Sequence, residues 1–149
     1  MDDTLLWDVR TFIYQHFATT ARAPELDVIA QHFTIGQAQA AEILNALDAI
    51  HALFLEPSTT AIRIANPFSA IPTPFAVEVN GRRYWANCAW DSFGVIAALQ
   101  ALAGTIHATC TQSGEPLHLA VEQGEVVDTS AVIHLLVPFR QWYEDMIFT

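Results

Sequence analysis

The sequence predicts an α+β fold, and three observations support this. The first part contains three stretches in which apolar residues recur at helical spacing, and the last part contains short apolar stretches separated by turn residues. Between them, residues 66–74 (NPFSAIPTP) carry three prolines and no helical pattern. We therefore expect a helical subdomain over residues 1–65, an extended linker over 66–74, and a small mixed β-sheet with one helix over 75–149.

The helical subdomain is expected to end in a hairpin. Helices are predicted over Thr4–Thr19, from Pro24 through Phe33, and over Gln37–Ile50, followed by the apolar pieces Ala52–Leu55 and Ala61–Ala65. This order is the outline of a winged helix-turn-helix, which usually indicates DNA binding. The third helix has no Lys or Arg, however, and the formal net charge of the chain is −10. Because phosphate backbones attract cationic surfaces, we favour a helical cap and expect no nucleic-acid partner.

The part after the linker is expected to consist mainly of hairpins. Asn80-Gly81 is the strongest two-residue hairpin signal, and it separates the predicted strands Phe75–Val79 and Arg82–Trp85. A second strand pair, Thr105–Thr111 and Leu117–Glu122, flanks Ser113-Gly114. The remaining predictions are a central strand over the apolar run Ala131–Val137, the start of a helix over Phe139–Asp145, and the beginning of a strand over Met146–Thr149.

The stretch Tyr84–Gly104 carries the candidate chemistry, since it predicts a strand end, a turn and a helix that stops at Gly104. Cys88 lies where that helix begins, and Asp91 follows one turn later on the same face. Helix N-termini favour the thiolate form of a cysteine, and a carboxyl group in apolar surroundings can keep or exchange a proton. The alternatives are a buried structural thiol at Cys88 and a first-turn carboxylate without chemistry at Asp91.

Other candidate residues have structural alternatives of the same kind. Trp85, Trp90 and Phe93 could line an apolar pocket beside Cys88, or belong to the core. His107, His118 and His134 lie on predicted strands and could form a zinc site with Cys110, but their spacing matches no zinc-finger pattern, so we expect exposed or hydrogen-bonded histidines. The start of the chain does not resemble a signal peptide, and no apolar run could span a bilayer. We expect a cytoplasmic protein with two free thiols and no membrane partner.

These residues together resemble the alkylmercury (organomercurial) lyase family. The resemblance rests on Pro67-Phe68-Ser69, Pro72-Thr73-Pro74 and Cys88-Ala89-Trp90-Asp91, and on a later hairpin, His107–Val121, with a cysteine before a Ser-Gly turn. The helical N-terminal segment also fits the family. The resemblance implies that residues 75–149 are a lyase-like core in which a thiolate binds mercury and an aspartate delivers a proton to the departing carbon. It implies no organic cofactor, and it implies a thiol carrier or mercuric reductase as the acceptor of Hg(II).

The family uses a second, downstream cysteine, and the match at that point is incomplete. In the family this cysteine lies beyond a segment like Gln141–Thr149, so we expect a C-terminally short member. Cys110 aligns instead with a family cysteine regarded as structural, although it could replace the second sulfur if its strand brought it near Cys88. Three interpretations stay open: protonolysis of carbon–mercury bonds by Cys88 and Asp91, a non-enzymatic thiol or metal sensor on the same scaffold, and a structural relic in which Cys88 is inert.

Overall fold

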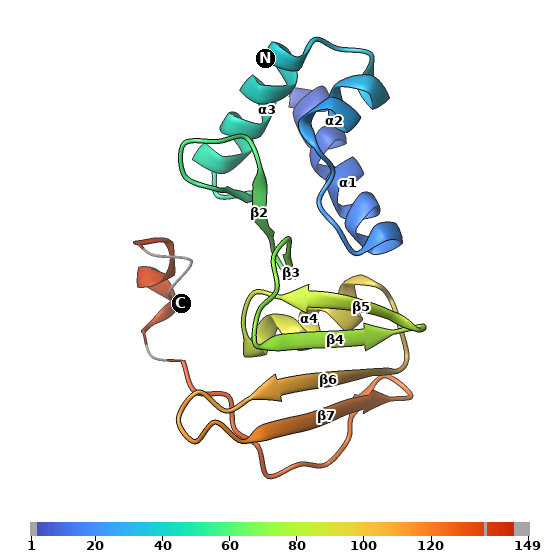
Figure 1. The fold of residues 1–149 in the computed structure, drawn as a ribbon, viewed down its shortest axis with the longest axis vertical. Helices are drawn as coiled ribbons and strands as arrows, with labels where there is room; N and C mark the ends of the chain where they lie inside the picture. Colours follow the sequence, from blue (N-terminus) through green and yellow to red (C-terminus); the bar gives the residue numbers. More distant parts are fainter. Residues whose placement is uncertain (1–2, 136, 145–149) are drawn as a thin grey trace. The chain divides into compact units, whose positions relative to one another are not determined.

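The computed structural model describes residues 3–135 and 137–144, and the chain divides into two units, residues 1–71 and 72–149 (Figure 1). The division falls inside the proline-rich segment 66–74. Each unit has its own secondary structure and is described separately. The strand expected over residues 146–149 lies outside the described residues.

The first unit contains three helices followed by three short strands. Its elements are α1 (Asp3–Thr20), α2 (Leu26–Phe33), α3 (Gln37–Ala49), β1 (Phe54–Leu55), β2 (Ile62–Ala65) and β3 (Phe68–Ser69). β2 pairs antiparallel with both β1 and β3. The three predicted helices and the hairpin after them are therefore confirmed, whereas the more specific likeness to a winged helix stays a prediction.

Apolar side chains at helical spacing build the core of this unit, as the sequence pattern predicts. Completely or almost completely buried residues come from all three helices, from β2 and β3, and from the segment before β1: Val9, Ile13, Phe17, Ile29, Ile43, Leu44, Leu47, Leu53, Ile64 and Phe68. The rings of Phe17 and Phe68 stack with centroids 5.3 Å apart. This contact ties the beginning of the proline-rich segment to α1.

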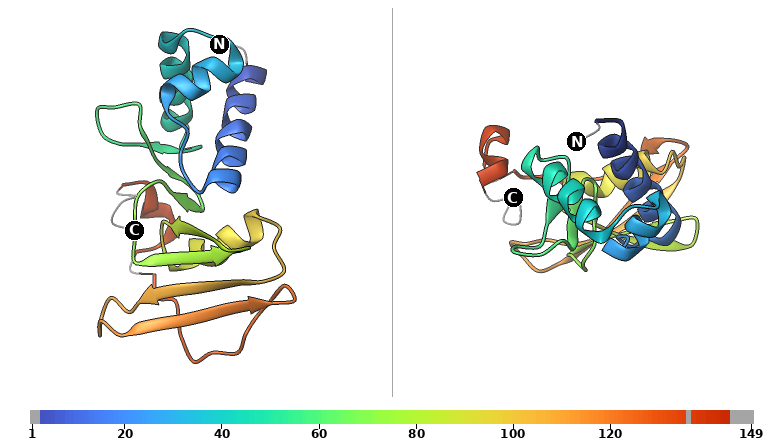
Figure 2. Two further views of the ribbon diagram at one scale, coloured as in Figure 1. Left: turned by 45° about the vertical axis from the view of Figure 1, so that its right-hand side comes forward. Right: turned by 90° about the horizontal axis from the view of Figure 1, so that it is seen from above.

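The second unit is an antiparallel sheet with one α-helix on its face (Figure 2). Its elements are β4 (Phe75–Val79), β5 (Arg82–Ala86), α4 (Ala89–Ala98), β6 (Gly104–Thr109), β7 (Pro116–Glu122), β8 (Glu125–Val126) and the 3-10 helix η1 (Phe139–Glu144). The strands lie in the order β5-β4-β6-β7-β8, and each neighbouring pair is antiparallel.

The expectation of a mixed sheet is wrong for these five strands. Two hairpins, β4–β5 and β6–β7, force antiparallel neighbours. The connection through α4 then places β6 against β4 on the side away from β5. β5 and β6 run in the same direction, but β4 lies between them, so they do not pair.

The two hairpins have the geometry that their turn residues predict. Asn80 and Gly81 both have positive φ angles, 51° and 74°, as a type I′ turn requires. In the second hairpin, the Gly114 N–H donates to the Cys110 carbonyl oxygen (2.8 Å) and the Cys110 N–H to the Glu115 carbonyl oxygen (2.9 Å). Local turn chemistry thus sets the register of both strand pairs.

Two further predictions in this unit are wrong. Residues 131–135 form no strand, and Val132 is 88% exposed. Among the described residues, the outer edge of β7 pairs only with the two-residue strand β8, and the apolar run pairs with no strand. The helix after Cys88 ends at Ala98, and the left-handed backbone conformation after it belongs to Gln100 (φ 52°) rather than to Gly104. Gly104 begins β6, where a Cβ atom would lie only 2.9 Å from Ile96 Cδ1 and 3.1 Å from Val79 Cγ2. The glycine therefore allows α4 to approach the sheet closely.

Candidate functional site

Cys88 is the N-cap residue of α4. The chain leaves β5 at Ala86, and Cys88 adopts an extended backbone (φ −145°, ψ 179°) before the helix begins. Its Sγ accepts a hydrogen bond from the Asp91 N–H (3.4 Å), and its carbonyl oxygen accepts one from the Ser92 N–H (3.1 Å). A thiol thus takes the role that Ser or Asp usually has at this position. The helix start holds the sulfur in one place beside the first turn.

Asp91 lies in that first turn, with its carboxyl group within hydrogen-bonding reach of the Cys88 thiol. Both residues are partly buried. Burial raises the pKa of Asp91 to about 6, although the hydrogen bond from Cys88 opposes this shift. A proton-exchanging role for this carboxyl group stays a prediction, which the raised pKa favours.

The expectation that the helix N-terminus makes Cys88 a thiolate is wrong for the protein without substrate. Burial raises the pKa of the thiol to about 11, and the nearby Asp91 charge raises it further. The backbone N–H groups of Asp91 and Trp90 act in the opposite direction, as the helix-terminus argument predicts, but they are the weaker influence. At pH 7 the proton therefore resides on sulfur, next to a carboxylate that can accept it.

The three aromatic candidates lie in different surroundings. Trp90 follows Cys88 closely but is 64% exposed, and Phe93 is half-buried one turn into α4. Tyr84, the cross-strand partner of Val77, faces the side of the sheet that α4 covers. Trp85 is the next residue along β5 and the cross-strand partner of Ala76, so its side chain projects from the other face of the sheet. The structure thus keeps Trp90 and Phe93 near the start of α4 and places Trp85 on the outer face.

Cys110 is not brought together with Cys88 and Asp91. It lies in the β6–β7 turn, where it is partly buried and where hydrogen bonds from Ser113 to its sulfur lower the pKa of the thiol. Within residues 3–135 and 137–144, no three side chains of the types His, Cys, Asp and Glu are close enough to hold a metal ion. A second sulfur for the Cys88 site is therefore not supplied by Cys110 in this arrangement.

The sequence reasoning missed two side-chain contacts in the β6–β7 hairpin. One is the hydrogen bonding of Cys110 by Ser113. The other is the contact between His107 and His118, which are cross-strand partners. The position of the turn could have revealed the second contact, since residues equally distant from the turn centre face each other across a hairpin.

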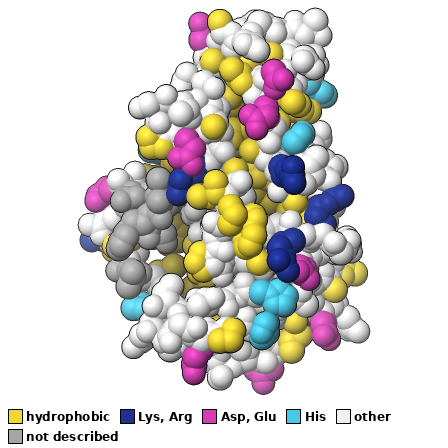
Figure 3. All heavy atoms as spheres, viewed as in Figure 1, with side chains coloured by type: hydrophobic (Ala, Val, Ile, Leu, Met, Phe, Trp, Pro, Cys, Tyr) yellow, Lys and Arg dark blue, Asp and Glu magenta, His cyan; other side chains and the backbone are white. Residues whose placement is uncertain are grey.

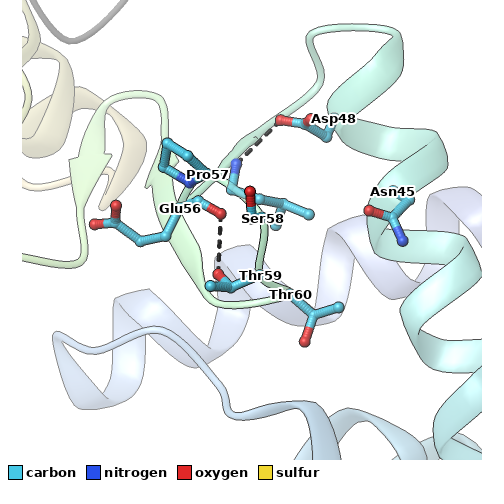
Figure 4. Close-up of a pocket in the computed structure, with 8 residues that line it drawn as sticks. Asn45, Asp48, Glu56, Pro57, Ser58, Thr59 and Thr60 are labelled. Atoms are coloured by element: carbon cyan, nitrogen blue, oxygen red, sulfur yellow. Dashed lines mark hydrogen bonds between the residues drawn. The ribbon is translucent and has the colours of Figure 1, made fainter.

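A separate hollow of about 570 Å³ lies in the first unit, between the end of α3 and the β1–β2 loop (Figure 4). It is lined by Asn45, Asp48, Leu55, Glu56, Pro57, Ser58, Thr59 and Thr60. Its carboxylates already have partners: Asp48 Oδ1 accepts from the Leu55 N–H (3.0 Å), and Glu56 Oε1 pairs with Arg63 (2.7 Å). Since both carboxylates take part in these structural contacts, we do not assign the candidate chemistry to this hollow.

Comparison with known proteins gives one consistent result. The family model for alkylmercury lyase matches residues 68–148, which is more than half of the chain. The alkylmercury lyases of Bacillus cereus and Clostridium butyricum are each 34% identical over 71 residues, covering 46% of this chain and 32% of the relative. The chain thus spans about a third of the length of these curated relatives.

A solved structure agrees with the sequence matches at the level of the fold. The mercury-bound form of MerB2 superposes with a TM-score of 0.68 at 22% identity, covering 87% of this chain and 61% of that chain. In the described part of our chain, none of the helices is long and apolar enough to cross a membrane. With the family model matching from β3 to beyond η1, this chain belongs to the alkylmercury lyase family.

Proposed function

We propose that the protein binds organomercury compounds through Cys88 and cleaves the carbon–mercury bond by protonolysis, with Asp91 carrying the proton. The observation that carries this proposal is the Cys88–Asp91 pair, a protonated thiol hydrogen-bonded to a carboxyl group whose pKa is about 6. Mercury is soft and prefers sulfur ligands, so the thiol is the natural point of attachment.

The pair accounts for every proton in the reaction. When Cys88 Sγ bonds to the mercury of an alkyl- or arylmercury thiolate, the incoming mercury displaces the proton from sulfur, the Asp91 carboxylate accepts it, and the previous thiolate ligand leaves. The protonated Asp91 then donates the proton to carbon as the carbon–mercury bond breaks. The hydrocarbon departs, and Hg(II) remains bound to sulfur. A carboxyl group with a pKa near neutrality is suited to both transfers.

Several features of the wider setting are part of the same proposal. No organic cofactor enters the scheme, because the thiol and the carboxyl group supply both binding and the proton. We place the protein in the cytoplasm, where thiols stay reduced and where a thiol carrier or a mercuric reductase can take Hg(II) from Cys88. Trp90 and Phe93 would contact the organic group. The N-terminal unit, winged-helix-like in outline, serves as a cap and not as a DNA-binding module, since α3 carries no Lys or Arg.

The second candidate function is mercury or thiol sensing without cleavage. The specific observation in its favour is that Cys110 does not join Cys88 and Asp91, so the described residues offer one sulfur and one carboxyl group instead of two sulfurs. A single thiolate binds mercury but donates less electron density to the carbon–mercury bond than two thiolates do. This candidate predicts a stable organomercury adduct on Cys88.

One experiment separates the two functions. The chain is incubated with phenylmercury and an excess of a physiological thiol, benzene is measured by gas chromatography, and the protein adduct by mass spectrometry. Lyase function predicts benzene from the wild type, none from Cys88→Ser, and an adduct without benzene from Asp91→Asn. Cys110→Ser is the matched control and should behave as the wild type. An adduct without benzene from the wild type would support sensing, and no adduct on Cys88 would overturn both functions.

A further inference from the structure

The outer face of the second unit's sheet carries a pair of histidines that the proposed reaction does not use. His107 on β6 and His118 on β7 are direct cross-strand partners, so their side chains project from the same face. This face is opposite to the one covered by α4, because Ile106 in the neighbouring register position is completely buried. Figure 3 shows histidine side chains (cyan) together at the molecular surface, beside acidic and basic side chains.

The two imidazole rings approach each other through the same nitrogen. His107 Nδ1 and His118 Nδ1 are 2.9 Å apart, and the rings are nearly perpendicular, with centroids 5.0 Å apart. One nitrogen therefore carries a proton and the other offers a lone pair. Two nitrogens that bind one metal ion in adjacent square-planar positions, each at about 2.0–2.1 Å, are about 2.9 Å from each other. In tetrahedral coordination they would be about 3.4 Å apart.

We propose that His107 and His118 form a two-imidazole site for a divalent transition-metal ion with a square-planar preference, above all Cu²⁺. A change of tautomer, in which the Nδ1 proton of the donor ring moves to its Nε2 through solvent, and a turn of each ring about its broad Cβ–Cγ torsion would direct both Nδ1 lone pairs at one ion. Water would occupy the other positions, since the described residues offer no third His, Cys, Asp or Glu ligand at this place. The site is independent of the Cys88 chemistry, which uses the start of α4.

The charges around the pair favour a cation modestly. From β4, the Glu78 carboxylate is close enough to interact electrostatically with His107, but it is bound by Arg83 of β5 through bonds of 2.6 and 3.1 Å. From β7, Glu122 lies on the same face as His118, four residues along the strand. Thr105 and Thr109 flank His107 on β6 without charge. Since imidazole nitrogen is a borderline ligand, borderline metals should bind to this site better than Ca²⁺ or Mg²⁺, which prefer oxygen ligands.

The test uses Cu²⁺ and the 149-residue chain with both cysteines replaced, Cys88→Ser and Cys110→Ser, so that thiols neither bind nor reduce the metal. We expect one Cu²⁺ per chain at pH 7.5, with an electron paramagnetic resonance spectrum showing two equatorial nitrogens. A further His118→Gln or His107→Gln change should weaken binding by at least about tenfold, because the second imidazole is held at high effective concentration, and should leave one nitrogen in the spectrum.

The matched control is His134→Gln, which removes a single exposed histidine of the same unit and should leave both affinity and spectrum unchanged. The parent chain is the one in which only the two cysteines are replaced. If its spectrum shows fewer than two equatorial nitrogens, that result alone overturns the proposal. Equal Cu²⁺ affinity of the parent, His107→Gln and His118→Gln chains, each confirmed as folded by circular dichroism, would also overturn it.

Discussion

Replacing Asp91 by Asn should make Cys88 more acidic and faster to alkylate. Burial is the largest cause of the raised Cys88 pKa, and the charge of Asp91 and its hydrogen bond with the thiol add to it. An amide keeps the size of the side chain and removes the charge. The pKa of Cys88 should therefore fall from about 11 but stay above its ordinary value of 9.0, because burial remains.

The size of the effect follows from the ionised fraction of the thiol. With a pKa of about 11, roughly one Cys88 thiol in a thousand is ionised at pH 8. Removal of a nearby like charge lowers a pKa by about one unit, which raises that fraction about tenfold. Thiolates become less nucleophilic as their pKa falls, with a Brønsted coefficient of about 0.4–0.5, so the net gain in alkylation rate at pH 8 is about threefold.

The assay is iodoacetamide labelling between pH 7 and 11, with each cysteine followed separately by peptide mass spectrometry. Cys110 is an internal control, since its pKa is set by Ser113 and Glu115 and not by Asp91. Asp27→Asn is the matched variant, because it removes a first-turn aspartate from α2 and should leave Cys88 unchanged. A Cys88 pKa that is equal or higher in Asp91→Asn would refute the assignment of a shared proton to this pair.

Two further predictions concern stability. The pKa of Asp91 is raised by burial to about 6 in the folded protein, against about 3.9 in unfolded chains, so the contribution of Asp91 to folding stability is fully present below about pH 4 and is lost as the pH rises through 6. Asp91→Asn should therefore raise Tm relative to the wild type more at pH 7.5 than at pH 4. A Tm difference that does not change with pH would contradict this. Gly104→Ala should destabilise the protein by about 1–3 kcal/mol through overpacking against Ile96 and Val79. Gly36→Ala, where a Cβ would meet nothing within 4 Å, should cost clearly less, and equal losses in urea denaturation would remove the explanation.

Local signals in the sequence were sufficient for the elements whose stability is local. The apolar spacing of Val9, Ile13 and Phe17 predicted α1 and its buried face, and Asn80-Gly81 predicted the β4–β5 hairpin, because positive φ angles at both residues favour that turn. The same kind of evidence placed Cys88 at a helix start with Asp91 one turn later. These predictions succeeded because neighbouring residues along the chain determine helix caps and tight turns.

Other outcomes depended on which segments meet in space. An apolar run such as Ala131–Val137 becomes a strand only where it meets a partner edge, and its described residues 131–135 pair with no strand. The protonation of Cys88 was decided by burial and by the Asp91 charge, which together outweigh the helix terminus. The separation of Cys110 from Cys88 and Asp91 likewise follows from strand order, since β4 lies between the strands that lead to the two cysteines. The sequence by itself thus determined the local elements and the pairing of Cys88 with Asp91. The tertiary structure decided which strands are neighbours and that the proton of the Cys88–Asp91 pair resides on sulfur, because burial and long-range contacts do not exist until the chain has folded.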